Sequence, residues 1–320
     1  MTQKIIFMGT PDFSVPILNA LIAAPEYDVI AAVTQPDRPV GRKKVLQPTP
    51  VKAAALAGDV PVFQPVKLGG SEELDQLIAM EPDLIVTAAY GQFLPTRFLE
   101  SAKIAAINVH ASLLPKYRGG APIHYAVMNG DAKTGVSIMY MVKKMDAGDV
   151  LAQAEIAIPE NATTGEMFAE LSTLGRDTLL ATLPGLIAGD IVGTPQDPDA
   201  VSFSPNIAPE EEVLDFNGSA QSVHNHVRGL NPFPTAHTTI NGVRTKIQKT
   251  HLPAEATDLP AGAIVKKTKK ELWLAAGDGQ VIAIDELQPA GKPKMAVAAY
   301  LNGHASFNEG DIVITHDESK

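Results

Sequence analysis

An asparagine and a histidine at alternate positions, with an aspartate further along the chain, are the residues best suited to chemistry. Asn108 and His110 mark the end of the apolar run 104–109. In an extended strand, residues i and i+2 point to the same face. Both side chains should therefore converge at the C-terminal end of a buried strand, where open α/β sheets bind their ligands.

The aspartate, Asp146, stands in a second turn-rich segment, Met145–Asp149. A carboxylate beside an imidazole fixes the tautomer and the orientation of the ring. The chain has no cysteine, so thiolate catalysis and disulfides are excluded. A base, a neutral hydrogen-bond donor and a carboxylate are the groups that acyl or formyl transfer requires, and no nucleophilic serine is needed if the substrate brings an amine.

Two other kinds of site lack support in the sequence. The turn Gly9-Thr10-Pro11-Asp12 has neither the dinucleotide pattern G-x-G-x-x-G nor the phosphate loop G-x-x-x-x-G-K. This argues against a dehydrogenase or a kinase. His110, His124, Asp146 and Asp149 lack the tight spacing of strong zinc motifs, so no metal site is expected.

In the first half of the chain, short apolar runs alternate with helix-length segments, which predicts a doubly wound, mostly parallel α/β sheet of Rossmann-like type. A serine at 71 and a capping box formed by Thr163 and Glu166 indicate where two of the helices begin. The expected strands are 4–8, 29–34, 60–64, 83–90, 104–109 and 136–141, and the expected helices are 14–24, 71–80 and 164–188.

The composition changes after residue 189. The next stretch is rich in proline and has no helical period, which is typical of a linker. Beyond a short helix at 219–227, Asn241-Gly242 predicts a type I′ hairpin between 235–240 and 243–249, and a second hairpin is expected between 271–275 and 281–287. We therefore expect a small OB-like β-barrel. The predicted domains are 1–189 (catalytic), 190–208 (linker) and 209–320 (barrel).

The net charge of −10 argues against broad, sequence-independent nucleic-acid binding. Basic residues nevertheless gather in one loop, at Arg38, Arg42, Lys43 and Lys44, and in the run 266–270. The N-terminal apolar stretch is too short for a signal peptide or a membrane span, so we expect a cytoplasmic protein. Two domains with no apolar repeat favour a monomer.

The fifteen residues from Asn108 to Pro122 resemble the signature of the 10-formyltetrahydrofolate-dependent formyltransferases. Tyr90–Pro95 and Met145–Asp149 fall where that family has its other active-site segments. The segment Gln35–Arg42 is similar to an insertion found in the members that formylate methionyl-tRNA, and Asn231–Ala236 resembles part of their C-terminal domain. The resemblance covers nearly the whole chain.

The resemblance implies a catalytic trio of Asn108, His110 and Asp146, with folate as the formyl donor and no metal. The residues that it places at the folate site are Tyr90, Gly91, Gln92, Phe93, Leu94, Ser112, Leu113, Leu114 and Pro115. Those that it places at tRNA are Arg38, Arg42, Lys43 and Lys44, with Arg42 reaching the acceptor end. The implied reaction is formyl transfer from 10-formyltetrahydrofolate to the α-amino group of initiator methionyl-tRNA, a step of translation initiation that draws on one-carbon metabolism.

Some residues depart from the family pattern. Ala147 stands where a threonine is usual, which removes a hydroxyl but leaves the carboxylate of Asp146, and Phe233 stands where tryptophan is more frequent. From Glu210 onward there are 11 Lys and Arg against 14 Asp and Glu, fewer basic residues than an RNA-binding domain usually carries. Alternative readings are a formyltransferase for a nucleotide amino-sugar or another small amine, a folate-dependent hydrolase, and a non-catalytic folate- or RNA-binding protein.

Overall fold

The protein folds as two compact units, seen in a computed structural model that describes residues 2–40, 44–304 and 306–315. The first unit comprises the chain up to Pro122, Lys133–Ala157 and Phe168–Pro205. The second comprises Ile123–Ala132, Ile158–Met167 and the chain from Asn206 onward. The chain is therefore not divided at a single point, because two segments that precede Pro205 in the sequence belong to the second unit.

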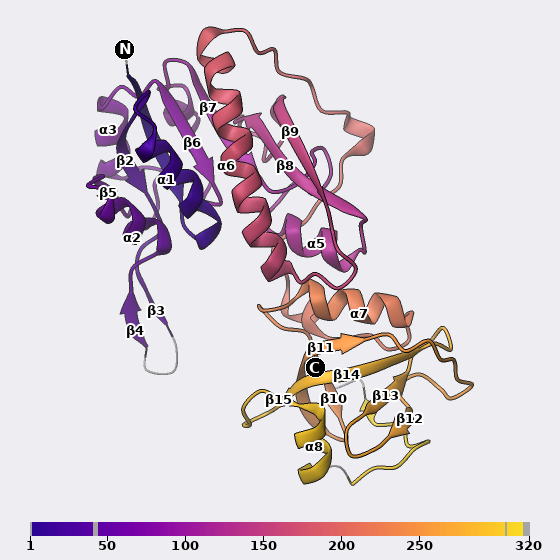
Figure 1. The fold of residues 1–320 in the computed structure, drawn as a ribbon. Coiled ribbons are helices and arrows are strands. Elements are labelled where there is room, and N and C mark those ends of the chain that lie inside the picture. The colour runs from indigo at the N-terminus through magenta and orange to yellow at the C-terminus, as the bar shows by residue number, and fades with distance from the viewer. Residues whose placement is uncertain (1, 41–43, 305, 316–320) are drawn as a thin grey trace. The chain divides into compact units, whose positions relative to one another are not determined.

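The first unit is built on one seven-stranded sheet (Figure 1). Its strands are β1 (Gln3–Gly9), β2 (Tyr27–Val33), β5 (Val62–Phe63), β6 (Leu84–Ala88), β7 (Ala105–His110), β8 (Lys133–Tyr140) and β9 (Val150–Ala157). The spatial order is β5-β2-β1-β6-β7-β8-β9. All pairs from β5 to β7 are parallel, and the last two pairs are antiparallel.

Helices cover both faces of this sheet. These helices are η1 (Asp12–Ser14), α1 (Val15–Ala23), α2 (Pro50–Ala57), α3 (Glu72–Ala79), α4 (Thr96–Leu99) and most of α6 (Thr164–Ala188), whereas α5 (Pro122–Met128) belongs to the second unit from Ile123 onward. Leu74 of α3 and Phe98 of α4 pack on one face in the cluster that contains Ile6. On the other face α6 approaches the sheet so closely that a Cβ on Gly175 would lie 2.9 Å from Val109 Cγ1.

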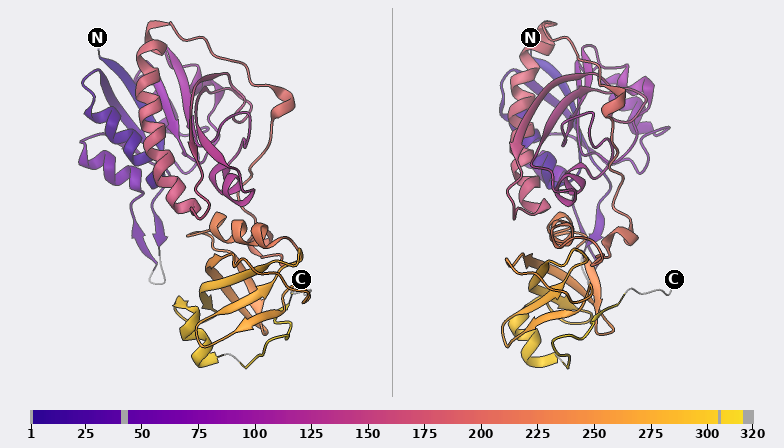
Figure 2. Two further views of the ribbon diagram at one scale, coloured as in Figure 1. Left: turned by 45° about the vertical axis from the view of Figure 1, so that its right-hand side comes forward. Right: turned by 90° about the vertical axis from the view of Figure 1, so that its right-hand side faces the viewer.

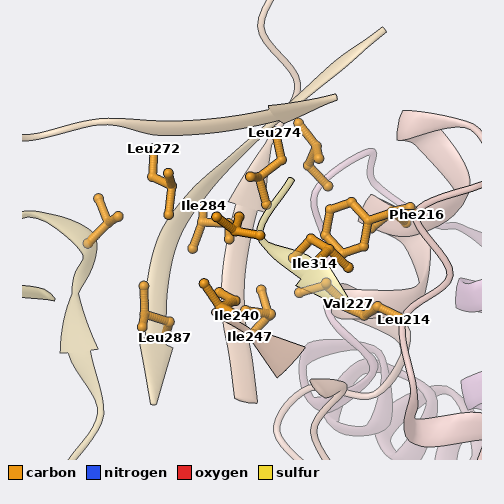
Figure 3. Packing of buried hydrophobic residues seen from close by; sticks show 14 of the residues in the cluster. Leu214, Phe216, Val227, Ile240, Ile247, Leu272, Leu274, Ile284, Leu287 and Ile314 are labelled. Atoms are coloured by element: carbon orange, nitrogen blue, oxygen red, sulfur yellow. The ribbon is translucent and has the colours of Figure 1, made fainter. Parts of the chain in front are cut away.

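The second unit contains an antiparallel sheet and its own core (Figures 1 and 2). Its elements are η3 (Pro209–Glu212), α7 (Ala220–Gly229), β10 (His237–Ile240), β11 (Val243–His251), β12 (Ile264–Lys267), β13 (Leu272–Ala275), β14 (Val281–Pro289), β15 (Met295–Ala296), α8 (Val297–His304) and β16 (Ile314–Thr315). The strand order is β12-β13-β14-β11-β10-β16, with β15 beside β14. Side chains from α7 and from the strands meet in one apolar cluster (Figure 3).

The chain segment before β16 curls this sheet toward closure. The Ile264 N–H donates to Asp311 O at 2.9 Å, and the Gly310 N–H donates to Ile264 O at 2.8 Å. The predicted hairpin at Asn241-Gly242 is present, and both residues have the positive φ (48° and 76°) that a type I′ turn requires. The expected fold class, an α/β sheet followed by a small antiparallel barrel, is confirmed.

Several elements differ from the prediction. The hairpin of β3 (Arg38–Val40) and β4 (Val45–Gln47) was not expected, because its strands are short and carry charge and proline. Strand β9 was also missed, since its alanine-rich sequence lacks the β-branched residues typical of strands. Within the described ranges, none of the helices is long and apolar enough to cross a membrane.

The predicted capping box begins helix α6. Thr163 Oγ1 accepts from the Glu166 N–H at 3.3 Å, and Glu166 Oε2 accepts from the Thr163 N–H at 2.7 Å. The hydrogen bonds from Thr163 hold the pKa of Glu166 below its usual value. A lowered folded pKa means that this stabilisation is complete above the pKa of an unfolded glutamate and is lost as the pH falls through the folded value.

We expect Thr163→Ala to lower the free energy of unfolding at pH 7 by about 1 kcal/mol, because it removes one acceptor for the free N–H groups of the first turn. The measurement is urea unfolding followed by circular dichroism. Thr163→Ser keeps the hydroxyl and should stay close to the parent protein. Equal losses in the two variants would show that the methyl group, not the cap, is responsible.

Candidate active site

The expected trio is brought together at the C-terminal end of β7. Asn108 and His110 lie on the face opposite Val109, as strand alternation requires, and Asp146 lies in the turn between β8 and β9. His110 Nδ1 is 3.8 Å from Asp146 Oδ2, and both side chains are largely buried, at 6% and 14% exposed. An imidazole and a carboxylate therefore face each other in a region of low solvent access.

The hydrogen bond at the other ring nitrogen decides the tautomer of His110. Nε2 lies 2.9 Å from the carbonyl oxygen of Tyr117. A carbonyl can only accept, so Nε2 must carry the proton and donate it. In the neutral ring this leaves the lone pair on Nδ1, the atom that faces Asp146. Nδ1 is thus the ring nitrogen that can accept a proton.

The turn that carries Asp146 is tightly constrained. Asp146 has φ of +48°, a left-handed conformation that aspartate tolerates better than most residues. Its Oδ2 accepts a hydrogen bond from the Gly119 N–H at 2.9 Å. At Gly148 an added Cβ would lie 1.9 Å from Tyr140 O, so only glycine fits there. The Asp146 carboxylate is therefore held by the Gly119 N–H, and its turn packs closely against the backbone of Tyr140.

The neighbouring strand orients Asn108. Thr87 is paired with Asn108 in the β6–β7 register, and its hydroxyl donates to Asn108 Oδ1 at 2.7 Å. With its carbonyl oxygen used in this way, the amide of Asn108 keeps its N–H₂ group for another partner. Thr87 was not singled out from the sequence, because only the strand pairing reveals that it faces Asn108.

The loop Ser112–Pro115 is anchored on the antiparallel strands. Ser137 Oγ of β8 donates to Ser112 O at 2.6 Å, and Gln153 Nε2 of β9 donates to Leu114 O at 2.9 Å. The side chain of Ser112 is fully buried and donates to Lys116 O at 2.6 Å. Leu113 and Pro115 are partly exposed, so these two, with the loop backbone, are the parts that remain accessible.

In the segment Tyr90–Leu94 the residues face different ways. The Tyr90 ring is buried in the cluster under α3, while its carbonyl accepts from Thr10 Oγ1 at 3.0 Å. Gln92 Oε1 accepts from the Leu68 N–H at 3.0 Å. Phe93, in contrast, is 76% exposed. Gly91 has a positive φ of 92°, and Leu94 packs on the apolar cluster.

The basic loop forms the hairpin β3–β4, which projects from the sheet (Figure 1). Asp37 at its base pairs with Lys52, with 2.6 Å between Oδ2 and Nζ, and this contact lowers the pKa of Asp37. Among the described residues, Arg38 and Lys44 have no carboxylate within salt-bridge distance. Arg42 and Lys43 lie outside the described residues.

A cavity of about 550 Å³ lies in the first unit where this hairpin meets the sheet. It is lined by residues that include Thr10, Gln35, Arg38, Thr49, Tyr90 and Gly91. The trio does not line it, but β6, which ends just before Tyr90, is the direct neighbour of β7. Tyr90 and Gly91, which line the cavity, thus follow the strand that pairs directly with the strand of Asn108 and His110. Within the described ranges, no group of three or more His, Asp and Glu could hold a metal ion.

Comparison with known proteins gives matches along the chain. Residues 3–183 match the family model described as formyl transferase, and residues 206–305 match the model of the formyl transferase C-terminal domain. A methionyl-tRNA formyltransferase of Pediococcus pentosaceus is 59% identical over 99% of this chain and 100% of its own. One of Levilactobacillus brevis is 60% identical over 94% of this chain and 95% of its own.

Solved structures with the same fold have much lower sequence identity. An N-formyltransferase from Helicobacter canadensis, in complex with folinic acid and dTDP-3-aminofucose, is 17% identical, with a TM-score of 0.68 over 90% of this chain and 100% of its own. The sugar 3-N-formyltransferase WlaRD, solved with dTDP and 5-N-formyl-THF, is also 17% identical, with a TM-score of 0.67 over 92% of this chain and 100% of its own.

A buried tyrosine, Tyr90, and a partly buried one, Tyr125, offer a contrast that can be tested. Burial raises the pKa of each to about 12. The Tyr90 hydroxyl has no hydrogen-bond partner among the described residues, whereas the Tyr125 hydroxyl donates to Glu211 Oε1 at 2.6 Å. A buried hydroxyl without a partner costs about 1–3 kcal/mol.

We therefore expect Tyr90→Phe to leave the free energy of unfolding unchanged or to raise it by up to about 1 kcal/mol, while Tyr125→Phe lowers it by about 1.5–3 kcal/mol. The measurement is denaturant unfolding of both variants beside the parent protein. A loss of stability in Tyr90→Phe would reveal a polar partner for its hydroxyl.

Proposed function

Since the chain belongs to the formyltransferase family and, within it, to the methionyl-tRNA formyltransferases, we propose that it transfers the formyl group of 10-formyltetrahydrofolate to the α-amino group of methionyl-initiator-tRNA. The observation that carries this proposal is the pairing of His110 Nδ1 with the Asp146 carboxylate, beside the amide of Asn108. These groups suit a reaction in which an amine attacks a carbonyl carbon.

The bond changes follow from the positions of these groups. The amine nitrogen attacks the formyl carbon, a C–N bond forms, and the carbonyl electrons move to the oxygen. The Asn108 N–H₂ group donates to that oxygen as it becomes negative. Removing such a donor typically costs about 10²–10³ in rate.

Proton transfer is the task of His110. Nδ1 takes the proton that the attacking amine releases, and the Asp146 carboxylate stabilises the imidazolium that results. His110 then gives this proton to the folate nitrogen as the bond between that nitrogen and the formyl carbon breaks. The tetrahedral centre returns to a carbonyl, and all charges and protons balance without a metal or a covalent enzyme intermediate.

The formyl donor is proposed to bind beside the trio, along the backbone of Tyr90–Leu94 and the loop Ser112–Pro115. The exposed ring of Phe93 and the accessible edge of Leu113 provide apolar surface for a flat aromatic donor. The solved formyltransferases with formylated tetrahydrofolate or folinic acid support folate as the donor.

The acceptor is proposed to enter from the side of the β3–β4 hairpin. Arg38 lines the cavity there, and a loop that carries two arginines and two lysines suits the phosphates and unpaired bases of an RNA end. Identity of 59–60% to methionyl-tRNA formyltransferases favours this acceptor over the amino-sugar of the solved enzymes, which are 17% identical.

We assign catalysis to residues 1–189 and RNA binding to residues 209–320, joined by 190–208. The barrel has few basic residues, so we expect the run 266–270 to provide much of its affinity for RNA. The enzyme is proposed to act in the cytoplasm, where translation starts, and as a monomer, since two domains with no apolar repeat favour one. Its role is then translation initiation, with one-carbon units supplied by folate.

We expect His110→Ala to reduce the single-turnover rate of formyl transfer by about 10²–10⁴-fold, because the proton acceptor is lost. Asn108→Ala and Asp146→Ala should each lose most of the turnover while keeping the fold. His251→Ala, an exposed histidine paired with Asp285 in the second unit, is the control and should keep the parent rate. A near-parental rate in His110→Ala would contradict the mechanism.

For the acceptor, we expect Arg42→Ala to weaken the use of methionyl-tRNA much more than the binding of folate. Arg97→Ala is a matched control, since Arg97 is exposed and pairs with Asp75 away from the hairpin. The measurements are kcat/KM for methionyl-tRNA and the Kd for folate by calorimetry. Equal losses for both ligands would mean that Arg42 supports the folate site instead.

A further inference from the structure

The segment Thr194–Ser204, here called the strap, is the last part of the first unit before the chain enters the second, and it makes specific contacts with the loops of the trio. We propose that Gln196 of the strap is a positioning residue that holds the Asp146 turn in the geometry needed for formyl transfer. The proposal rests on the catalytic role assigned to Asp146 above.

The side-chain amide of Gln196 uses its full hydrogen-bonding capacity. Nε2 donates to Asp146 O at 2.9 Å and to Gly148 O at 2.7 Å, one hydrogen to each carbonyl. Oε1 accepts from Arg118 Nε at 3.0 Å and from Arg118 Nη2 at 2.7 Å. An amide offers two donors and two lone pairs, so every one is engaged, and its orientation follows from its neighbours.

The guanidinium of Arg118 anchors the Gln196 amide through two hydrogen bonds. Arg118 is 5% exposed, although its place in a glycine-rich loop predicts a solvated charge. Among the described residues, no carboxylate lies within salt-bridge distance of it. Its guanidinium is therefore held by the neutral Gln196, and the positive charge stays close to the Asp146 turn without being cancelled by a direct ion pair.

The strap also contacts the carbonyl group of Tyr117, which accepts the hydrogen bond from His110. Ser204 Oγ donates to Tyr117 O at 3.0 Å, and this carbonyl is the acceptor for His110 Nε2. The Arg118 N–H donates to Ser202 O at 2.9 Å, and the Ser204 N–H donates to Arg118 O at 2.8 Å. The strap thus holds both the loop that fixes the His110 tautomer and the turn that presents Asp146.

Loss of the Gln196 amide should lower the rate of formyl transfer more than it weakens the binding of folate. Nothing else among the described side chains donates to both Asp146 O and Gly148 O. Without it the turn, with Asp146 at positive φ, loses two hydrogen bonds that define its position. A misplacement of about 1 Å at a reacting group can cost about 10²-fold in rate.

Two variants distinguish a role of Gln196 in positioning Asp146 from a role in stabilising the fold alone. Gln196→Ala removes all four hydrogen bonds. Gln196→Glu keeps an acceptor for Arg118, now as an ion pair, but it has no hydrogens for the two carbonyls of the turn. If Gln196 positions Asp146, both variants lose about 10–100-fold in single-turnover rate, with much smaller changes in folate Kd. Asp199→Ala, at an exposed strap residue that takes part in these contacts only through its backbone N–H, serves as the control and keeps the parent rate.

The decisive measurement is a double-mutant cycle with Asp146→Asn. In that background Gln196→Ala should slow the reaction by no more than about 2-fold, because it acts through a carboxylate that is already gone. A near-parental rate in Gln196→Glu, or an undiminished effect of Gln196→Ala beside Asp146→Asn, would overturn the proposal while leaving the trio intact. Full activity of Asp146→Asn itself would overturn both the trio and this proposal. Thermal unfolding of each variant confirms that the fold is retained.

Discussion

The hydrogen bond from His110 Nε2 to the carbonyl of Tyr117 is the constraint on which the site depends. It determines which nitrogen carries the proton, and therefore which nitrogen can accept one. The carbonyl, in turn, is held by Ser204, and the facing carboxylate is held by Gly119 and, through its turn, by Gln196. Each member of the proposed trio is thus fixed by groups that do not react.

The sheet explains why these groups meet. Parallel strands bring Thr87 and Asn108 to the same edge, and the register of β6 and β7 pairs them directly. Strand β8 runs antiparallel to β7, from Ser137 opposite His110 to Tyr140 opposite Ile107, and the segment between β8 and β9 then brings the Asp146 carboxylate to 3.8 Å from His110 Nδ1. A sheet that stayed parallel would need a long crossover before each further strand, and β8 and β9 could not be joined by one short turn.

Which of these contacts could be predicted from the sequence depends on how far apart the two residues lie along the chain. The alternation of Asn108 and His110 is local, and it predicts their common face correctly. The partners Thr87 and Gln196 could not be predicted, because strand register and a contact across 50 residues leave no local pattern. Tyr90 shows another limit, since the sequence marks the segment but not that its ring is buried in the core. The burial of Arg118 could not be predicted either, because burial of a charge depends on the acceptors that tertiary structure supplies.

The strap bears on where an autonomous catalytic fragment would have to end. A fragment that stops at Gly189, where helix α6 is complete, would keep every strand of the first sheet and every member of the trio. It would lack the amide bound to the Asp146 turn and the hydroxyl bound to Tyr117. By its contacts the first unit extends to Pro205, immediately before the chain re-enters the second unit. A protease cut between 190 and 196 would therefore break the chain between the first sheet and the side chains that contact the Asp146 turn and the Tyr117 carbonyl.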